Sequence, residues 1–216
     1  MNKQNLKKRI FTSLGLFFLI LLIITYDFIL VYSLIVIGVL CIIEFSNILQ
    51  KIIKNKINFL LSNLIFTIYI FLFCFIFFLF SNYLFSKLLL FIVLIGCVGS
   101  DIGGYIFGKI FKGPKLTKIS PNKTITGAIG SIILTSIIMS FLIIYLAKNF
   151  SYFIILIAVI TSIGCQLGDL FFSFLKRKSN LKDTGNILPG HGGILDRVDG
   201  ILLGLPIGLI LLILFY

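Results

Sequence analysis

Long runs of apolar residues follow one another along the chain, and polar residues gather in the segments between them. A helix needs about 17–25 mostly apolar residues to cross the hydrocarbon core of a bilayer. Seven runs are that long or nearly so: 10–25, 28–43, 57–80, 83–99, 127–147, 152–172 and 200–216. The pattern predicts an all-α, polytopic membrane bundle of about seven transmembrane helices. The first two runs are short and meet at Tyr26 and Asp27, so a re-entrant hairpin is an alternative for this pair.

The composition agrees with a membrane protein. Hydrophobic residues make up 59% of the chain and charged residues 12%, whereas about 25% of a soluble domain is charged. Lys7, Lys8 and Arg9 precede the first run, as in a signal peptide, but no small-x-small cleavage site follows. We therefore expect the first run to stay as an uncleaved span.

The basic residues predict the orientation of the chain. Cytoplasmic loops of membrane proteins are enriched in Lys and Arg. If the N-terminus is cytoplasmic, only Lys87 and Lys148 of the 19 Lys and Arg residues fall on the opposite side. Because the excess positive charge lies between apolar runs, anionic lipid headgroups or a polyanionic small molecule are better partners than nucleic acid.

Two connections differ from the others, because segments 100–126 and 173–199 are long, polar and rich in Gly, Lys and Asp. Long loops in compact proteins are usually functional or disordered, and both of these fall on the predicted cytoplasmic side. We expect two regions: N-terminal transmembrane helices in 1–99, about four spans, and a C-terminal catalytic membrane region in 100–216. The second region would hold both loops and about three spans.

Asp169 is an acidic residue near the end of an apolar run. A charge at the bilayer centre costs about 2.5–3.5 kcal/mol on insertion scales, and such residues are functional by default. Gln166, Asp169, Ser173 and Lys176 are spaced by three or four, so they share one helix face. The stripe indicates a polar cavity; the alternative is an ion pair that joins two spans.

Asp196 and Asp199 lie three residues apart before the last run. One Asp at that place is explained by the preference of acidic residues for helix N-termini. Two of them suit a hard cation, since Mg²⁺ binds through one or two carboxylates together with substrate phosphates. We predict that Asp196 and Asp199, with Asp169, are metal ligands.

The glycine-rich stretches allow two interpretations. Gly99 and Gly103, like Gly104 and Gly108, are spaced four apart, as in close helix packing. His191, the single histidine, lies among the glycines of 189–193, where backbone amides can cradle phosphate or the histidine can be structural. Lysines beside Ser and Thr residues in 100–124 suit a polyphosphate, although no P-loop pattern occurs.

Together these segments carry a recognisable signature. In 173–199 it consists of Ser173, Lys176, Arg177, Lys182, Asp183, Gly185, the run 188–194, Asp196, Arg197, Val198 and Asp199. Upstream it continues in Ser100, Asp101, Gly104, Tyr105, the run 120–124, Gly168 and Asp169. The pattern, which covers about half of the chain, resembles that of the phosphatidate cytidylyltransferase (CDP-diglyceride synthase) family. Thr126 departs from it, standing where that family usually has an acidic residue.

The resemblance implies a reaction at the cytoplasmic membrane face, in which CTP and phosphatidic acid give CDP-diacylglycerol and pyrophosphate with Mg²⁺. In this hypothesis Asp169, Asp196 and Asp199 hold Mg²⁺, with or without a second cation. The catalytic candidates are Lys176, Arg177, Lys182, His191 and Arg197. The nucleotide-binding candidates are Ser100, Asp101, Lys123, Thr124, Ser173 and Asp183.

Two other functions stay open at this point. A related enzyme would use another lipid phosphate as the acceptor, and a small membrane transporter would use the intramembrane carboxylate and the broken glycine-rich segments differently. We expect a multi-pass protein of a bacterial-type inner membrane, with the active-site loops facing the cytoplasm, and a homodimer is compatible with it.

Overall fold

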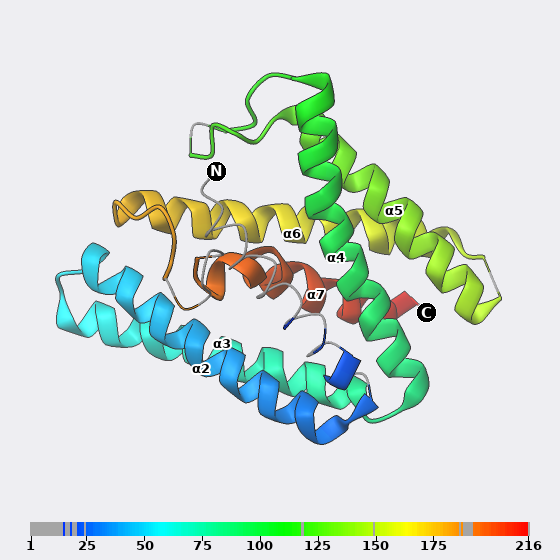
Figure 1. Ribbon diagram of the computed structural model, residues 1–216, viewed down its shortest axis with the longest axis horizontal. Coiled ribbons are helices and arrows are strands. Elements are labelled where there is room, and N and C mark those ends of the chain that lie inside the picture. Colours follow the sequence, from blue (N-terminus) through cyan, green and yellow to red (C-terminus); the bar gives the residue numbers. More distant parts are fainter. Residues whose placement is uncertain are drawn as a thin grey trace. The chain divides into compact units, whose positions relative to one another are not determined.

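The helices of the chain alternate with short connections and build no sheet within the described residues. The computed structural model (Figure 1) describes Gly15, Phe18 and residues 21–23, 25–117, 119–148, 150–185, 187 and 192–215. The predicted first span, 10–25, lies mostly outside this set. One isolated antiparallel bridge joins Lys115 to Thr124.

Six helices of the described chain are long and apolar enough to cross a membrane. They are α2 (Asp27–Ile52), α3 (Lys56–Ser81), α4 (Leu84–Phe111), α5 (Ile125–Ala147), α6 (Tyr152–Lys178) and α7 (Leu195–Phe215). The helical class and the apolar runs from residue 28 onward are confirmed. Large side chains such as Phe71 and Phe141, each 68% exposed, need a non-aqueous surrounding, which a bilayer supplies.

The predicted limits of the two polar connections are wrong. Helix α4 continues to Phe111, α6 continues to Lys178 and α7 begins at Leu195, so the connections span only 112–124 and 179–194. The glycines of 100–111 do not end α4, because Gly can pack inside a contact between helices. The basic residues after 173 do not end α6 earlier, because positive charge is favourable in the last turn of a helix. The last turn of α6 holds Lys176, Arg177 and Lys178.

The described chain divides into two compact units. The first holds residues 1–79 and 175–198, and the second holds residues 80–174 and 199–216. The limits of these units run through α6 and α7. The predicted boundary between residues 99 and 100 falls inside α4, and the division into N-terminal spans and a catalytic region stays a prediction.

Small residues bring α4 and α5 into close contact in the second unit. A Cβ on Gly103 would lie 2.6 Å from the carbonyl oxygen of Gly130, and a Cβ on Gly130 would lie 2.3 Å from the Cβ of Phe107. Hydroxyl groups add bonds between the helices, since Ser131 Oγ donates to the carbonyl of Ser100 at 2.7 Å. The packing interpretation of the α4 glycines is therefore confirmed.

Helices α6 and α7 approach each other in the same way. A Cβ on Gly168 would lie 2.5 Å from the carbonyl oxygen of Asp199, and one on Gly164 would lie 3.2 Å from the Cα of Gly204. Small residues at such contacts let two backbones meet, which drives helix association where no hydrophobic effect operates. This contact sets the residue before Asp169 against the backbone of α7.

We predict that Gly130→Ala destabilises the second unit. The added methyl group would overlap the first atoms of the Phe107 side chain, which cannot move away without shifting α4. We expect a loss of about 1–3 kcal/mol in the free energy of unfolding, measured by denaturant titration in detergent. The matched control is Ile133→Val on the same helix, where the side chain is 43% exposed. Equal stability of the two variants would contradict the packing argument.

Candidate active site

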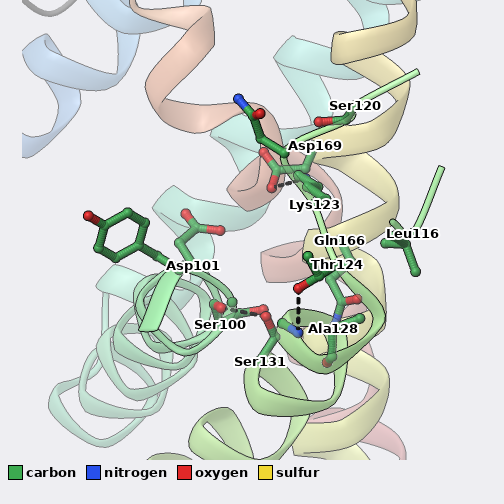
Figure 2. A pocket seen from close by; sticks show the side chains of 14 residues that line it. Ser100, Asp101, Leu116, Ser120, Lys123, Thr124, Ala128, Ser131, Gln166 and Asp169 are labelled. Atoms are coloured by element: carbon green, nitrogen blue, oxygen red, sulfur yellow. Dashed lines mark hydrogen bonds and ion pairs between the residues drawn. The ribbon is translucent and has the colours of Figure 1, made fainter. Parts of the chain in front are cut away.

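A pocket of about 320 Å³, lined in part by hydroxyl, carboxylate and ammonium groups, lies in the second unit. Its walls come from the C-terminal half of α4, the connection 112–124, the first turns of α5 and the middle of α6 (Figure 2). Five of the predicted functional residues line it: Ser100, Asp101, Lys123, Thr124 and Asp169. Segments far apart in the sequence thus contribute to one cavity, which the sequence spacing alone did not establish.

Lys123 and Asp169 form an ion pair at this pocket. The Nζ atom of Lys123 lies 2.5 Å from Oδ2 of Asp169, and the two side chains are 30% and 25% exposed. A turn presents the lysine, because its N–H donates to the Ser120 carbonyl and its own carbonyl accepts from Leu116 N–H at 2.8 Å. Because both side chains of the ion pair are partly exposed, an anion in the pocket can reach the ammonium group of Lys123.

Thr124 begins α5 at the edge of the pocket. Its hydroxyl accepts a hydrogen bond from Gly127 N–H at 3.1 Å, which satisfies one of the free amides of the first turn. Thr126, the residue that departs from the family pattern, accepts from Gly113 N–H at 3.2 Å. A threonine at this position therefore ties the preceding connection to α5.

Ser100 belongs to a buried network under the pocket. It is 1% exposed, and its Oγ lies 3.0 Å from Oγ of Ser162 on α6. Gln166 of the predicted polar stripe donates to the Ala128 carbonyl at 3.2 Å and to Ser162 Oγ at 3.4 Å. These bonds join α4, α5 and α6, and the predicted contact of Ser100 with nucleotide stays a prediction.

The first unit contains a separate polar cluster around Asp196. Its Oδ1 accepts from Lys176 Nζ at 2.6 Å. Its Oδ2 accepts from the N–H groups of Thr184 at 2.8 Å and Gly193 at 3.2 Å. Asp196 lies in the first turn of α7, where negative charge is favourable. These bonds agree with the helix-terminus alternative, and a role as a metal ligand stays a prediction.

Glu44 is the functional candidate that the sequence analysis missed. It lies on α2, is 1% exposed, and accepts a hydrogen bond from the Thr184 hydroxyl at 2.6 Å. The available signal was a single carboxylate next to the apolar run 28–43. Since charged residues within membrane helices are functional by default, that signal was sufficient to include Glu44.

The remaining candidates lie in the connection 179–194 or in the adjoining ends of α6 and α7. Arg177, Lys182, Asp183 and Arg197 are exposed, and Ser173 is half-buried. His191 lies outside the described residues. Gly192 has a φ of +85°, a conformation that residues with a side chain rarely adopt.

The chemistry of the pocket fits a hard cation. Mg²⁺ prefers oxygen ligands and usually combines one or two carboxylates with phosphate and water. Asp101 and Asp169 line one pocket together with Ser and Thr hydroxyls. No group of three or more His, Cys, Asp or Glu residues in the described parts of the chain is placed to hold a metal. Because Asp196 belongs to the first unit and Asp169 and Asp199 to the second, the predicted three-carboxylate site stays a prediction.

Relatives with a similar sequence occur in diverse bacteria. A phosphatidate cytidylyltransferase of Staphylococcus haemolyticus is 47% identical over 116 residues, which are 53% of this chain and 45% of the relative. One of Helicobacter pylori is 42% identical over 119 residues, 52% of this chain and 42% of the relative. One of Rickettsia felis is 40% identical over 128 residues, 56% of each.

The chain thus spans about half the length of the curated relatives that it matches. The match to a sequence model of a protein family covers more of the chain than the matches to these relatives. The sequence model described as the cytidylyltransferase family matches residues 1–215. The chain therefore belongs to the cytidylyltransferase family.

Proposed function

We propose that the protein is a phosphatidate cytidylyltransferase, which transfers the cytidylyl group of CTP to phosphatidic acid and releases pyrophosphate. The observation that carries this proposal is the pocket that holds Lys123, Asp101 and Asp169 among helices long and apolar enough to cross a membrane. Triphosphate chemistry needs cationic and carboxylate groups, while the acyl chains of the substrate need an apolar surrounding. The names of the bacterial relatives support the same reaction.

The proposed reaction exchanges one bond at the α-phosphorus of CTP. A phosphate oxygen of phosphatidic acid forms a bond to that phosphorus, and the bond to the oxygen bridging the α- and β-phosphates breaks. Pyrophosphate leaves with that oxygen, and the product is CDP-diacylglycerol. Because the nucleophile is already an anion, no strong general base is needed, so catalysis depends on positioning and on neutralising charge.

Lys123 is the group in the pocket best suited to bind phosphate. Its side chain is 30% exposed beside Asp169, so it can donate to a phosphate oxygen while the carboxylate keeps the ammonium in place. The start of α5 also borders the pocket through Thr124 and Gly127, and the N-terminus of a helix carries partial positive charge that favours anions. Both features supply positive charge where the triphosphate would lie.

Asp169 and Asp101 are the pocket residues that would hold Mg²⁺, and the roles of Asp196 and Asp199 as ligands stay predictions. When bound, the cation would neutralise triphosphate charge and stabilise the leaving pyrophosphate. In the first unit, Lys176 is paired with Asp196, and Arg177, Lys182 and Arg197 are exposed. These four cationic side chains are the candidates for contact with phosphate oxygens.

We further propose that both connections face the cytoplasm of a bacterial-type inner membrane. The distribution of Lys and Arg supports this orientation, and CTP is a cytoplasmic substrate. A homodimer is compatible with this orientation.

The first prediction concerns the reaction itself. With CTP labelled at the α-phosphate, phosphatidic acid and Mg²⁺, the purified protein should give a chloroform-soluble labelled product and an equal amount of pyrophosphate. EDTA should abolish both signals, and excess Mg²⁺ should restore them. Transfer to an isoprenoid or ether-lipid phosphate in preference to phosphatidic acid would select the related enzyme. Absence of CTP-dependent pyrophosphate release would contradict the enzyme assignment and favour the transporter.

The second prediction concerns the ion pair. Asp169→Asn and Lys123→Met should each lower kcat/KM by about 100-fold or more, the usual effect of removing a group that stabilises transition-state charge. Because the two residues act together, the double variant should be little worse than either single variant. The matched control is Asp27→Asn, an exposed aspartate at the start of α2. Near-normal turnover of Asp169→Asn would remove this residue from the mechanism.

A further inference from the structure

Glu44 is a buried carboxylate, and its hydrogen-bond partners among the described residues lie about 140 or more residues further along the chain. Its Oε2 accepts from Thr184 Oγ1 at 2.6 Å and from Leu195 N–H at 2.9 Å, and its Oε1 accepts from Ile194 N–H at 3.0 Å. All four residues belong to the first unit. Helix α2 is thereby bonded to the connection 179–194 and to the start of α7.

The three hydrogen bonds satisfy both the amides at the start of α7 and the buried carboxylate of Glu44. The first N–H groups of a helix have no partner within the helix, and α7 begins at Leu195. A carboxylate at that end satisfies these amides and interacts favourably with the helix dipole. A buried carboxylate, in turn, must be fully hydrogen-bonded to be tolerated. Glu44 therefore acts as the capping group of α7, supplied by a distant helix.

Two glycines of the signature segment, Gly185 and Gly193, make room for the side chain of Glu44. A Cβ on Gly185 would lie 2.6 Å from Oε1 of Glu44, and its next two neighbours would be atoms of the same side chain. A Cβ on Gly193 would lie 2.5 Å from Oε2 of Glu44 and 2.0 Å from Oγ1 of Thr184. Side chains at either position would force the carboxylate out.

Thr184 transmits this contact to the charged cluster. Its hydroxyl donates to Glu44, while its backbone N–H donates to Oδ2 of Asp196 at 2.8 Å. The other oxygen of Asp196 holds Lys176. One short segment is thus fixed between two carboxylates, and a change at Glu44 reaches both Asp196 and Lys176.

We propose that Glu44 is a positioning residue, which holds the connection 179–194 and the first turn of α7 so that Asp196 and Lys176 keep their geometry. As far as it concerns turnover, this inference rests on the proposed function. The claim that Glu44 holds this segment in place is independent of the proposed function, because it follows from the hydrogen bonds and from the two glycines.

The first test compares Glu44→Gln with the unchanged protein. The amide has the same shape, but it replaces an acceptor with an NH₂ group that faces donors, so at least one bond is lost. Hydrogen exchange should become faster at residues 184 and 193–195. The value of kcat should fall by about 10-fold to 100-fold, as for outer-shell partners of other sites, with a smaller change in KM for CTP. Glu44→Asp, which keeps the charge, should recover part of kcat.

The matched control is Ser33→Ala, a buried polar residue of the same helix whose hydroxyl donates to the Leu30 carbonyl within α2. It should leave the exchange at 184 and 193–195 and the value of kcat unchanged. Equal exchange and turnover in Glu44→Gln and the unchanged protein would overturn the proposal. So would a uniform increase in exchange over all helices, since that describes general destabilisation.

The exchange measurement separates this proposal from the proposed function. If no preparation transfers cytidylyl groups, but Glu44→Gln loosens 184 and 193–195 selectively, the positioning contact stands and the assigned reaction fails. If transfer occurs and Glu44→Gln changes neither exchange nor kcat, the reaction stands and the positioning role fails.

A double-mutant cycle tests the role of Gly185. Gly185→Ala should lower kcat strongly in the natural background, because its methyl group would meet the Glu44 carboxylate. In a Glu44→Ala background the space is free, so the same substitution should have little additional effect. Equal fold-changes in both backgrounds would overturn the steric part of the argument.

Discussion

The constraint on which this protein depends is the high cost of leaving a charge unpaired among apolar helices. Three acidic side chains meet this cost with specific partners. Asp169 is paired with Lys123, Asp196 with Lys176 and two amides, and Glu44 with a hydroxyl and two amides. Each partner comes from a connection or from the end of another helix. The same interactions that make the charges tolerable therefore bring the irregular segments to defined positions.

Exposure distinguishes the roles of these pairs. Glu44 is almost fully buried and accepts hydrogen bonds from one hydroxyl and two amides, so it can orient neighbouring groups but cannot meet a substrate. Lys123 and Asp169 are each at least one quarter exposed and line a cavity. A substrate can compete for those groups. This difference is why the second unit's pocket is assigned to substrate binding and Glu44 to positioning.

Most of the fold could be predicted from the sequence, because apolar runs of sufficient length have few alternatives to membrane-spanning helices. The ends of α4, α6 and α7 could not be predicted. Residues such as Gly103 and Lys176 look like loop residues by type, yet they sit inside helices because each has a packing or terminal partner. The contacts of Glu44 could not be predicted for a related reason. Its partners Thr184 and Leu195 are distant in sequence, so the pattern around residue 44 contains no sign of them.

Glycine shows why local pattern alone is insufficient at such sites. Gly103 and Gly130 are small so that the backbones of α4 and α5 can touch. They are required for as long as the two helices pack against each other. Gly185 is small so that one carboxylate can enter a connection, and a larger residue should be tolerated there once that carboxylate is removed. The first kind of glycine serves stability, and the second serves the position of charged groups. Only the atom that a Cβ would meet distinguishes them, and that atom belongs to another part of the chain.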